Sequence, residues 1–321
     1  STDITYWPEA IRRGVELRTR CRVREITVRA DGFADGVIYV DADGIAQRQK
    51  AEVVIVAGNA IGTPRLLLNS TSNLFPDGLA NSSGLVGRNL MLHAMALTQG
   101  VFDKPLKGYQ GPIGCSLWSK EFYETDLRRG FARGYTMEIL RGSGPVAAAQ
   151  MGMATGVLPW GEGHHEAFRQ MFDRTAAICA VCEDLPEEHN RVTLDPELTD
   201  SDGIPAARID YQLGDNSQKM LRHAGERCTE VLNAAGAVFV APTITSGVVS
   251  GHAMGTTRMG RDASSSVVNE WGRSHDVKNL FIADSSMFVT SGGVNPTSTL
   301  QALSLYVADN IKARLANLFD D

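Results

Sequence analysis

Apolar and polar positions form recognisable patterns along the chain, and the clearest pattern lies near its end. Residues 279–284 read NLFIAD, a short apolar run that predicts a buried strand ending in a carboxylate. A loop of Ser, Thr, Gly and Pro follows. Asn295, Pro296 and Thr297 then predict a helix that runs to about Leu315, with Asn295 as its cap and Pro296 at the first helical position. The positive partial charge of a helix start favours a negatively charged group there.

The first 70 residues predict a helix, a hairpin and a strand–turn–helix unit. Residues 1–14 have a helical apolar stripe, and residues 17–28 and 36–41 read as two paired strands around Asp-Gly turns. The β-branched run at 53–57 is typical of a strand covered on both faces. A glycine turn and a helix over 62–68 follow, which together favour a phosphate-type site.

The middle of the chain has a different pattern. Apolar residues with helical spacing predict a helix over 216–235, ended by Gly236. Alternating and aromatic stretches predict a mainly antiparallel sheet, and they lie at 135–140, 176–183, 191–194 and 207–213.

A second glycine motif lies at residues 137–147 and reads MEILRGSGPVA. It fits a strand followed by GxGxxA, but a dinucleotide site also needs a βαβ unit and an acidic residue at a second strand end. Pro145 stands inside the turn. We therefore interpret this stretch as a loop of the central segment.

Two other motifs could hold a metal or a redox pair. His164 and His165 are adjacent, and adjacent histidines rarely point at one ion. Cys179 and Cys182 form a CxxC inside an apolar run, where residues three apart on a strand face opposite sides. We interpret the cysteines as small buried hydrophobes and expect no metal site.

Composition narrows the class of protein. The 321 residues are 43% hydrophobic and 21% charged, and the net charge is −6, which favours neither nucleic acid nor an anionic membrane as a partner. No apolar run approaches the length of a membrane span. Five irregularly spaced cysteines form no disulfide framework. Because no signal peptide is visible, we expect a cytoplasmic location, with the periplasm as the alternative.

Several motifs together resemble one enzyme family. They are HAMGTTRMG from His252 onward, SSVVN, NLFIADSSMF, SGGVNPTSTLQAL, VVIVAGNAIGTPRLLLNS from Val53 and GLVGRNLMLHA from Gly84. In their order along the chain, they resemble the glucose-methanol-choline (GMC) flavoprotein oxidoreductases, mainly their carboxy-terminal part, and among these the bacterial sugar and polyol dehydrogenases. The family usually continues the last motif with Asp-His-Pro. Here the residues are Leu92, His93 and Ala94, so His93 is interpreted as a structural histidine.

The resemblance implies an α/β (α+β) fold, in which part of an FAD-binding Rossmann-like domain carries an inserted, mainly antiparallel-sheet substrate domain. Residues 1–95 and 243–321 would belong to the FAD-binding domain, and 96–242 to the substrate-binding domain. The catalytic motif would lie in the last part. The residues that the resemblance places against FAD are Val23, Ala57, Gly58, Thr63, Asp284, Ser285, Asn295, Pro296 and Thr297.

The resemblance also implies a reaction, the oxidation of an alcohol CH–OH in a sugar, polyol or glycoside. His252 would be the base that takes the hydroxyl proton while hydride passes to flavin N5, and Asn295 would hold the substrate oxygen. Without the resemblance, His252 would be read as a histidine bonded inside a tight loop. The electron acceptor stays open among oxygen, a quinone and a heme subunit.

The chain begins at Ser1 without the GxGxxG unit that binds the ADP part of FAD in this family. We therefore expect a fragment, a cleaved product or one chain of a split protein, with a second polypeptide carrying the missing amino-terminal FAD-binding part. Two alternatives to the complete enzyme stay open. One is a subunit that completes a flavin site only with another chain, and the other is a flavin-containing lyase.

Overall fold

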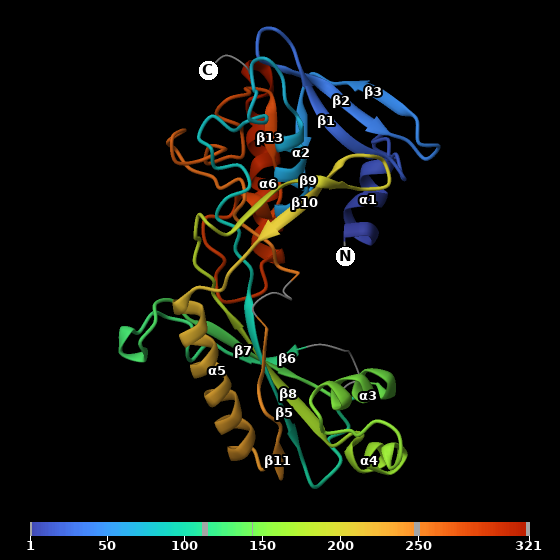
Figure 1. Ribbon diagram of the computed structural model, residues 1–321, viewed down its shortest axis with the longest axis vertical. Coiled ribbons are helices and arrows are strands. Elements are labelled where there is room, and N and C mark those ends of the chain that lie inside the picture. The colour runs from blue at the N-terminus through green and yellow to red at the C-terminus, as the bar shows by residue number, and fades with distance from the viewer. Residues whose placement is uncertain (1, 111–114, 143, 247–250, 319–321) are drawn as a thin grey trace.

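The computed structural model describes residues 2–110, 115–142, 144–246 and 251–318, and these form two lobes (Figure 1). The upper lobe of the figure holds both ends of the described chain. The lower lobe holds a larger sheet with helices beside it. Within the described part of the chain, none of the helices combines the length and the apolar composition that a bilayer crossing needs.

The first elements of the upper lobe are a helix and a three-stranded antiparallel meander. Helix α1 (Thr2–Arg12) is followed by the antiparallel strands β1 (Arg22–Val28), β2 (Ala34–Val40) and β3 (Ala46–Lys50). The predicted helix and hairpin are confirmed. The apolar stripe of α1 is not buried, however, since Ile11 is 49% exposed and α1 has no buried residue.

The centre of the upper lobe is a parallel pair of strands. Strand β4 (Val54–Val56) pairs with β13 (Leu280–Ile282), which is the predicted NLFIAD strand. Helix α2 (Asn59–Asn69) follows β4 directly. The prediction that β4 is covered on both faces is wrong for the described residues. Val54 and Val56 are buried against the core, but Ile55 points the other way and is 53% exposed.

The buried amide of Asn279 joins three segments of this lobe. Its Oδ1 accepts from the N–H of Ala34 at 2.9 Å, and its Nδ2 donates to the carbonyls of Ala34 at 2.7 Å and Glu52 at 2.8 Å. The entrance of β13 is thereby bonded to the start of β2 and to the residues before β4. This explains why an amide stands at the beginning of an apolar strand.

The last part of the chain returns to the upper lobe. The short helix η2 (Ser285–Met287) follows β13, and a loop then leads to α6 (Thr297–Ala313) and η3 (Leu315–Asn317). The predicted helix is confirmed, but the prediction that Asn295 caps it is wrong. Pro296 occupies the cap position, and no side chain makes a cap hydrogen bond.

The lower lobe contains the predicted antiparallel sheet. Its order is β11–β5–β8–β7–β6, and β12 also pairs with β5. Helix α5 (Asp215–Ala234) packs across β5 and β8 through Met220, Ala224 and Cys228, which confirms the predicted helix and its end before Gly236. The strands are β5 (Ala94–Val101), β6 (Cys115–Ser119), β7 (Tyr135–Leu140), β8 (Thr175–Cys182), β11 (Phe239–Val240) and β12 (Ile244–Ser246).

The sequence had suggested that the glycine motif at 137–147 is a loop, but most of it lies in a strand and the start of a helix. Strand β7 is followed by helix α3 (Pro145–Ala154), and Pro145 stands where a helix start tolerates its missing N–H. The arrangement is still no βαβ unit, because β7 runs antiparallel to both of its neighbours, β6 and β8. Two further short helices are η1 (Leu127–Arg129) and α4 (His164–Met171).

Two of the four predicted central strands lie elsewhere. Strands β9 (Arg191–Thr199) and β10 (Pro205–Asp210) form a separate hairpin that packs on α2 in the upper lobe (Figure 1). Arg65 of α2 holds the hairpin end, donating to the carbonyls of Pro205 at 2.6 Å and Ile204 at 3.0 Å and to Asp200 at 2.8 Å. A guanidinium contact between segments 135 or more residues apart is not visible in local sequence.

The cysteines are all free thiols. Cys179 and Cys182 lie on β8, where burial raises the pKa of Cys179 to about 11 and raises that of Cys182 as well. A thiol with a raised pKa is a poor nucleophile and a poor metal ligand at neutral pH. His164 Nδ1 donates to the carbonyl of Pro159 at 2.9 Å, at the start of α4.

The Asn279 contacts predict a specific loss of stability. In Asn279→Ala, the buried N–H and C=O of Ala34 lose their partner, so the free energy of unfolding should fall by about 2–4 kcal/mol. Chemical denaturation measures this. The control is Asn310→Ala, which removes a single bond to the carbonyl of Tyr306 within α6 and should cost about 0.5 kcal/mol or less. Equal losses in the two variants would contradict the role given to Asn279.

Candidate active site

The loop that carries His252 is held by backbone bonds on two sides. Met254 and Met91 exchange N–H···O bonds of 2.9 and 3.0 Å. On the other side, Ser285 Oγ donates to the carbonyl of Ala253 at 2.7 Å, and the N–H of Thr257 donates to Ser286 at 2.8 Å. The half-buried His252 is therefore fixed between the segment before β5 and helix η2.

Gly255 is required by this arrangement. Its φ is +93°, a conformation that side chains disfavour, and a Cβ there would lie 2.4 Å from the carbonyl oxygen of Asn89. The glycine lets the loop approach the segment before β5 closely enough for the Met91–Met254 bonds to form.

His93 is a partner of His252, although the sequence had led to its interpretation as a structural histidine. The Nδ1 atoms of the two rings are 2.9 Å apart, and the ring planes meet at 86°. His93 is fully buried, and its Nε2 lies 2.8 Å from the carbonyl oxygen of Gly292 and 3.3 Å from that of Ser291. Burial, followed by the neighbouring His252, lowers the pKa of His93 to about 4. Burial also lowers the pKa of His252.

His93 thus links the His252 loop to the loop that leads into α6. Asn295 lies three residues beyond Gly292 and is exposed, as are the first residues of α6, from Thr297 to Thr299. Since no side chain caps α6, its first N–H groups are available to a ligand, and their partial positive charge favours an anion.

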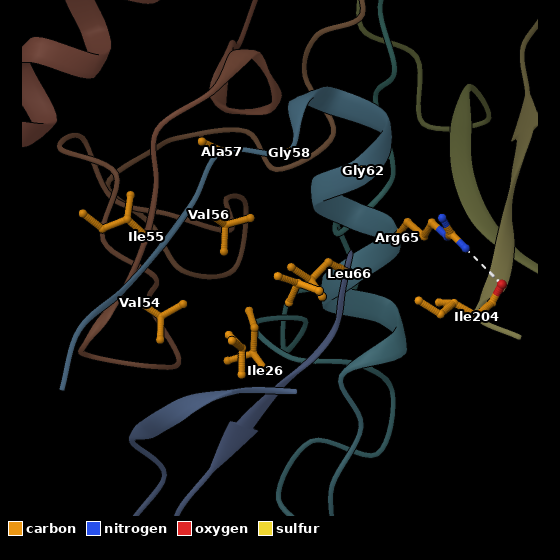
Figure 2. A pocket seen from close by; sticks show the side chains of 12 residues that line it. Ile26, Val54, Ile55, Val56, Ala57, Gly58, Gly62, Arg65, Leu66 and Ile204 are labelled. Atoms are coloured by element: carbon orange, nitrogen blue, oxygen red, sulfur yellow. Dashed lines mark hydrogen bonds between the residues drawn. The ribbon is translucent and has the colours of Figure 1, made fainter. Parts of the chain in front are cut away.

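Two neighbouring cavities lie in the upper lobe. The first, of about 360 Å³, has mainly apolar walls from β1, β4 and α2, among them Val23, Ala57 and Gly58. Figure 2 shows Ile26, Val56 and Leu66 facing one another between β4 and α2, while Arg65 points away toward Ile204. The second cavity, of about 470 Å³, lies between α1 and the start of α6.

Ala57 lines both cavities, which are therefore neighbours across the end of β4. The second cavity is also lined by Asp284, Ser285 and Thr297, so six of the nine predicted cofactor residues line one of the two. Pro296 lines a third cavity of about 320 Å³ with Phe288 and Leu303.

Thr63 and Asp284 are engaged with the protein itself. Thr63 is fully buried, and its hydroxyl donates to Asp284 at 2.5 Å and accepts from the N–H of Gly58 at 3.0 Å. The Asp284 carboxylate also accepts from the N–H of Ser286 at 2.8 Å and from its hydroxyl at 2.5 Å. These bonds hold the start of α2 against η2. Contact of either residue with a cofactor stays a prediction.

Comparison with known proteins identifies the family. Two models described as GMC oxidoreductase match the chain, one over residues 1–95 and the other over residues 186–304, together well over half of it. The chain belongs to the GMC oxidoreductase family.

Individual relatives of this GMC oxidoreductase chain support the same family. It is 42% identical to 2-methyl-1,2-propanediol dehydrogenase of Mycolicibacterium austroafricanum, over 98% of the chain and 58% of that protein. It is 31% identical to the fructose dehydrogenase large subunit of Gluconobacter japonicus, over 93% of the chain and 54% of that protein. The chain therefore spans little more than half the length of these relatives.

The fold is shared with more distant enzymes. A formate oxidase variant from Aspergillus oryzae superposes with a TM-score of 0.66 at 17% identity, covering 93% of the chain and 61% of the oxidase. Pyridoxine 4-oxidase from Mesorbium loti gives 0.64 at 15% identity, over 91% of the chain and 57% of that enzyme. These likenesses support the mixed fold, with antiparallel sheets and part of an FAD-binding domain.

The buried carboxylate of Asp184 holds the two segments that surround His93 in the GMC oxidoreductase. It accepts from the N–H of Leu92 at 3.1 Å, from Tyr211 at 2.8 Å and from Ser217 at 2.9 Å. The N–H of Asp184 donates to the hydroxyl of Ser291 at 2.9 Å, and this hydroxyl lies 3.1 Å from the Asp184 carbonyl. Asp184 could not be predicted from the sequence, because its partners lie up to 107 residues away.

Two substitutions of Asp184 separate its charge from its hydrogen bonds. Asp184→Asn can keep all three contacts, since its amide can donate to Ser217. Asp184→Ala leaves the buried N–H of Leu92 without its acceptor, so the free energy of unfolding should fall by about 1–3 kcal/mol. Denaturation curves of both variants measure the difference, and equal stability of the two would contradict the role of the carboxylate.

The same pair has an expected dependence on pH. Burial raises the folded-state pKa of Asp184 above its ordinary 3.8, although its hydrogen bonds oppose this. The wild type should therefore lose stability relative to Asp184→Asn as the pH rises from 3.8 through the raised pKa, because ionisation is less favourable in the folded state. A constant difference across this range would contradict the shift.

Proposed function

We propose that this chain carries the catalytic part of an FAD-dependent enzyme that oxidises an alcohol CH–OH of a sugar, polyol or glycoside. The observation that carries the proposal is the His252–His93 pair, which is bonded through His93 to the loop that leads into the uncapped start of α6. A neutral base suits removal of the proton from the substrate hydroxyl, and a positively polarised helix start suits the group that takes the hydride from the adjacent carbon.

The residues present fit FAD. The two cavities adjoin at Ala57, as a ligand with two linked parts requires, and the apolar walls of the first suit an aromatic ring. The start of α6 suits the part of a flavin that becomes negative on reduction. Bound FAD would supply the acceptor for the hydride. The residues proposed to contact it are Val23, Ala57, Gly58, Asp284, Ser285, Asn295, Pro296 and Thr297, with Thr63 supporting the turn.

His252 is proposed as the base. Because burial lowers its pKa below the ordinary 6.5, the ring is neutral at neutral pH and can take a proton from a hydroxyl. Asn295, on the exposed loop before α6, is proposed to donate its amide N–H to the substrate oxygen. An amide orients this oxygen without competing for the proton.

The substrate class rests on the relatives. One is named a dehydrogenase of a propanediol and another a subunit of a fructose dehydrogenase, so both names point to small molecules with several hydroxyl groups. We propose a substrate of this kind.

The second candidate is that the chain acts only together with a further stretch of polypeptide that completes the flavin site. It is favoured by β4, which pairs only with β13 among the described strands, and by the exposed Ile55 in the wall of the first cavity. An exposed strand edge beside apolar side chains is a site for strand addition. The added stretch would carry the remaining contacts to the ADP part of FAD.

The role of His252 is tested by His252→Asn in the FAD-loaded assembly. Anaerobic flavin reduction by a panel of sugars and polyols should slow by about 10²–10⁴-fold, because a placed base is lost. The FAD content should be unchanged. The control is His165→Asn at an exposed site on α4, which should reduce flavin at the wild-type rate. Reduction by His252→Asn at the control rate would remove His252 from the mechanism, and absence of reduction by any alcohol in the wild type would favour a lyase.

The need for a further stretch is tested by Ile55→Asp, with Leu117→Asp on exposed β6 as the control. A charge at Ile55 should abolish FAD retention and association with the added polypeptide, while the fold of this chain is kept. The visible spectrum measures FAD retention, and the native mass measures association with the added polypeptide. A 34.7 kDa species that holds FAD in Ile55→Asp would contradict the second candidate.

A further inference from the structure

The bond between His93 and His252 has a definite direction. It joins two Nδ1 atoms 2.9 Å apart, so one must carry a hydrogen and the other a lone pair. In a neutral imidazole one nitrogen donates and the other accepts. The ring that donates through Nδ1 therefore presents an unprotonated Nε2.

The other nitrogen of His93 decides the direction. Its Nε2 faces the carbonyl oxygens of Gly292 and Ser291, at 2.8 and 3.3 Å, and a carbonyl oxygen can only accept. Nε2 of His93 therefore carries the hydrogen. If His93 is neutral, its Nδ1 has a lone pair, and Nδ1–H of His252 must donate to it.

Both rings are neutral at neutral pH. His93 is fully buried, burial lowers its pKa to about 4, and the nearby His252 lowers it further. The pKa of His252 is lowered by its own burial. A doubly protonated His93 would reverse the direction of the bond, and burial disfavours this charged form.

We propose that His93 is a positioning residue that fixes the tautomer of His252, so that Nε2 of His252 is the nitrogen that takes the substrate proton. The role in turnover depends on the proposed function, whereas the position of the proton in the resting protein does not. When the hydroxyl O–H bond breaks, the proton passes to Nε2. Nδ1–H remains bonded to His93, so no second proton moves.

The surroundings of His93 hold it rigidly enough for this task. The carboxylate of Asp184 holds the N–H of Leu92, next to His93, while the main chain of Asp184 holds Ser291, whose carbonyl faces the ring. Asp184 therefore forms hydrogen bonds both to the residue before His93 and to Ser291, whose carbonyl orients the ring. A positioning role requires such support, because a shift of about 1 Å can cost 10²-fold in rate.

The position of the proton can be measured without turnover, by ¹⁵N NMR of the folded protein labelled at histidine. The His252 signals, assigned by their loss in His252→Asn, should show a hydrogen on Nδ1 and none on Nε2. In His93→Leu the hydrogen should shift toward Nε2. His93→Asn keeps an acceptor atom near the position of Nδ1 and should restore the wild-type pattern.

Two other histidines serve as internal controls in these spectra. His223, bonded to Tyr135, and His275, bonded to Ser266, should keep their signals in every folded variant. A wild-type His252 with its hydrogen on Nε2 would overturn the proposal, even if His93→Leu did not fold. So would a folded His93→Leu whose His252 signals are unchanged.

Flavin reduction in the FAD-loaded assembly gives the second readout. His93→Leu should slow reduction by about 10–100-fold, a part of the contribution of a placed base, with little change in the substrate concentration at half-maximal rate. His93→Asn should recover most of this loss. If the NMR pattern is as expected but neither His252 nor His93 variants slow reduction, the proposed function fails and the tautomer assignment stands. If His252→Asn slows reduction and His93→Leu does not, the positioning role is overturned.

Discussion

The site depends on one short backbone pairing between distant parts of the chain. Met91 and Met254 exchange two hydrogen bonds, and both side chains are fully buried. His93 lies two residues after Met91, and His252 lies two residues before Met254. The pairing of the two methionines therefore brings the two imidazoles together. A further bond from the N–H of Gly87 to the carbonyl of Thr256, at 2.8 Å, joins the same two segments and supports the 2.9 Å distance between the rings.

Burial then sets the chemistry of the pair. Two histidines with lowered pKa values are neutral at neutral pH, so the site presents a base and not a cation. In the proposed function, positive partial charge near the ligand would come instead from the uncapped start of α6, where it cannot be lost by deprotonation. In that proposal, one ring would accept a proton while a fixed dipole would favour negative charge.

Local sequence was enough to predict the elements around the site. The strand at 279–284, the unit of β4 and α2, and the helices α5 and α6 follow from apolar spacing and from Gly and Pro positions, and they are confirmed. Long-range contacts were not predictable in this way. His93 lies 159 residues from His252, and nothing in its own neighbourhood distinguishes a buried structural histidine from the partner of a base.

The wrong predictions have the same origin. The β9–β10 hairpin has ordinary strand patterning, but Arg65 holds it on α2 and not in the lower sheet. The apolar run of β4 predicted a strand buried on both faces, yet Ile55 is exposed. An apolar run alone does not show whether other residues cover each face of the strand. Asn295 is a residue type that often caps helices, but it lies one residue before the cap position of α6, which is Pro296.

The central claim is that His252 and the start of α6 face one flavin ring. A crystal structure of the FAD-loaded assembly tests it most directly. The account predicts that the His252 imidazole and the backbone N–H groups at the start of α6 both lie in contact with the isoalloxazine ring or with a substrate on it, within about 4 Å, while His252 stays bonded to His93. A ring bound away from either group would contradict the account.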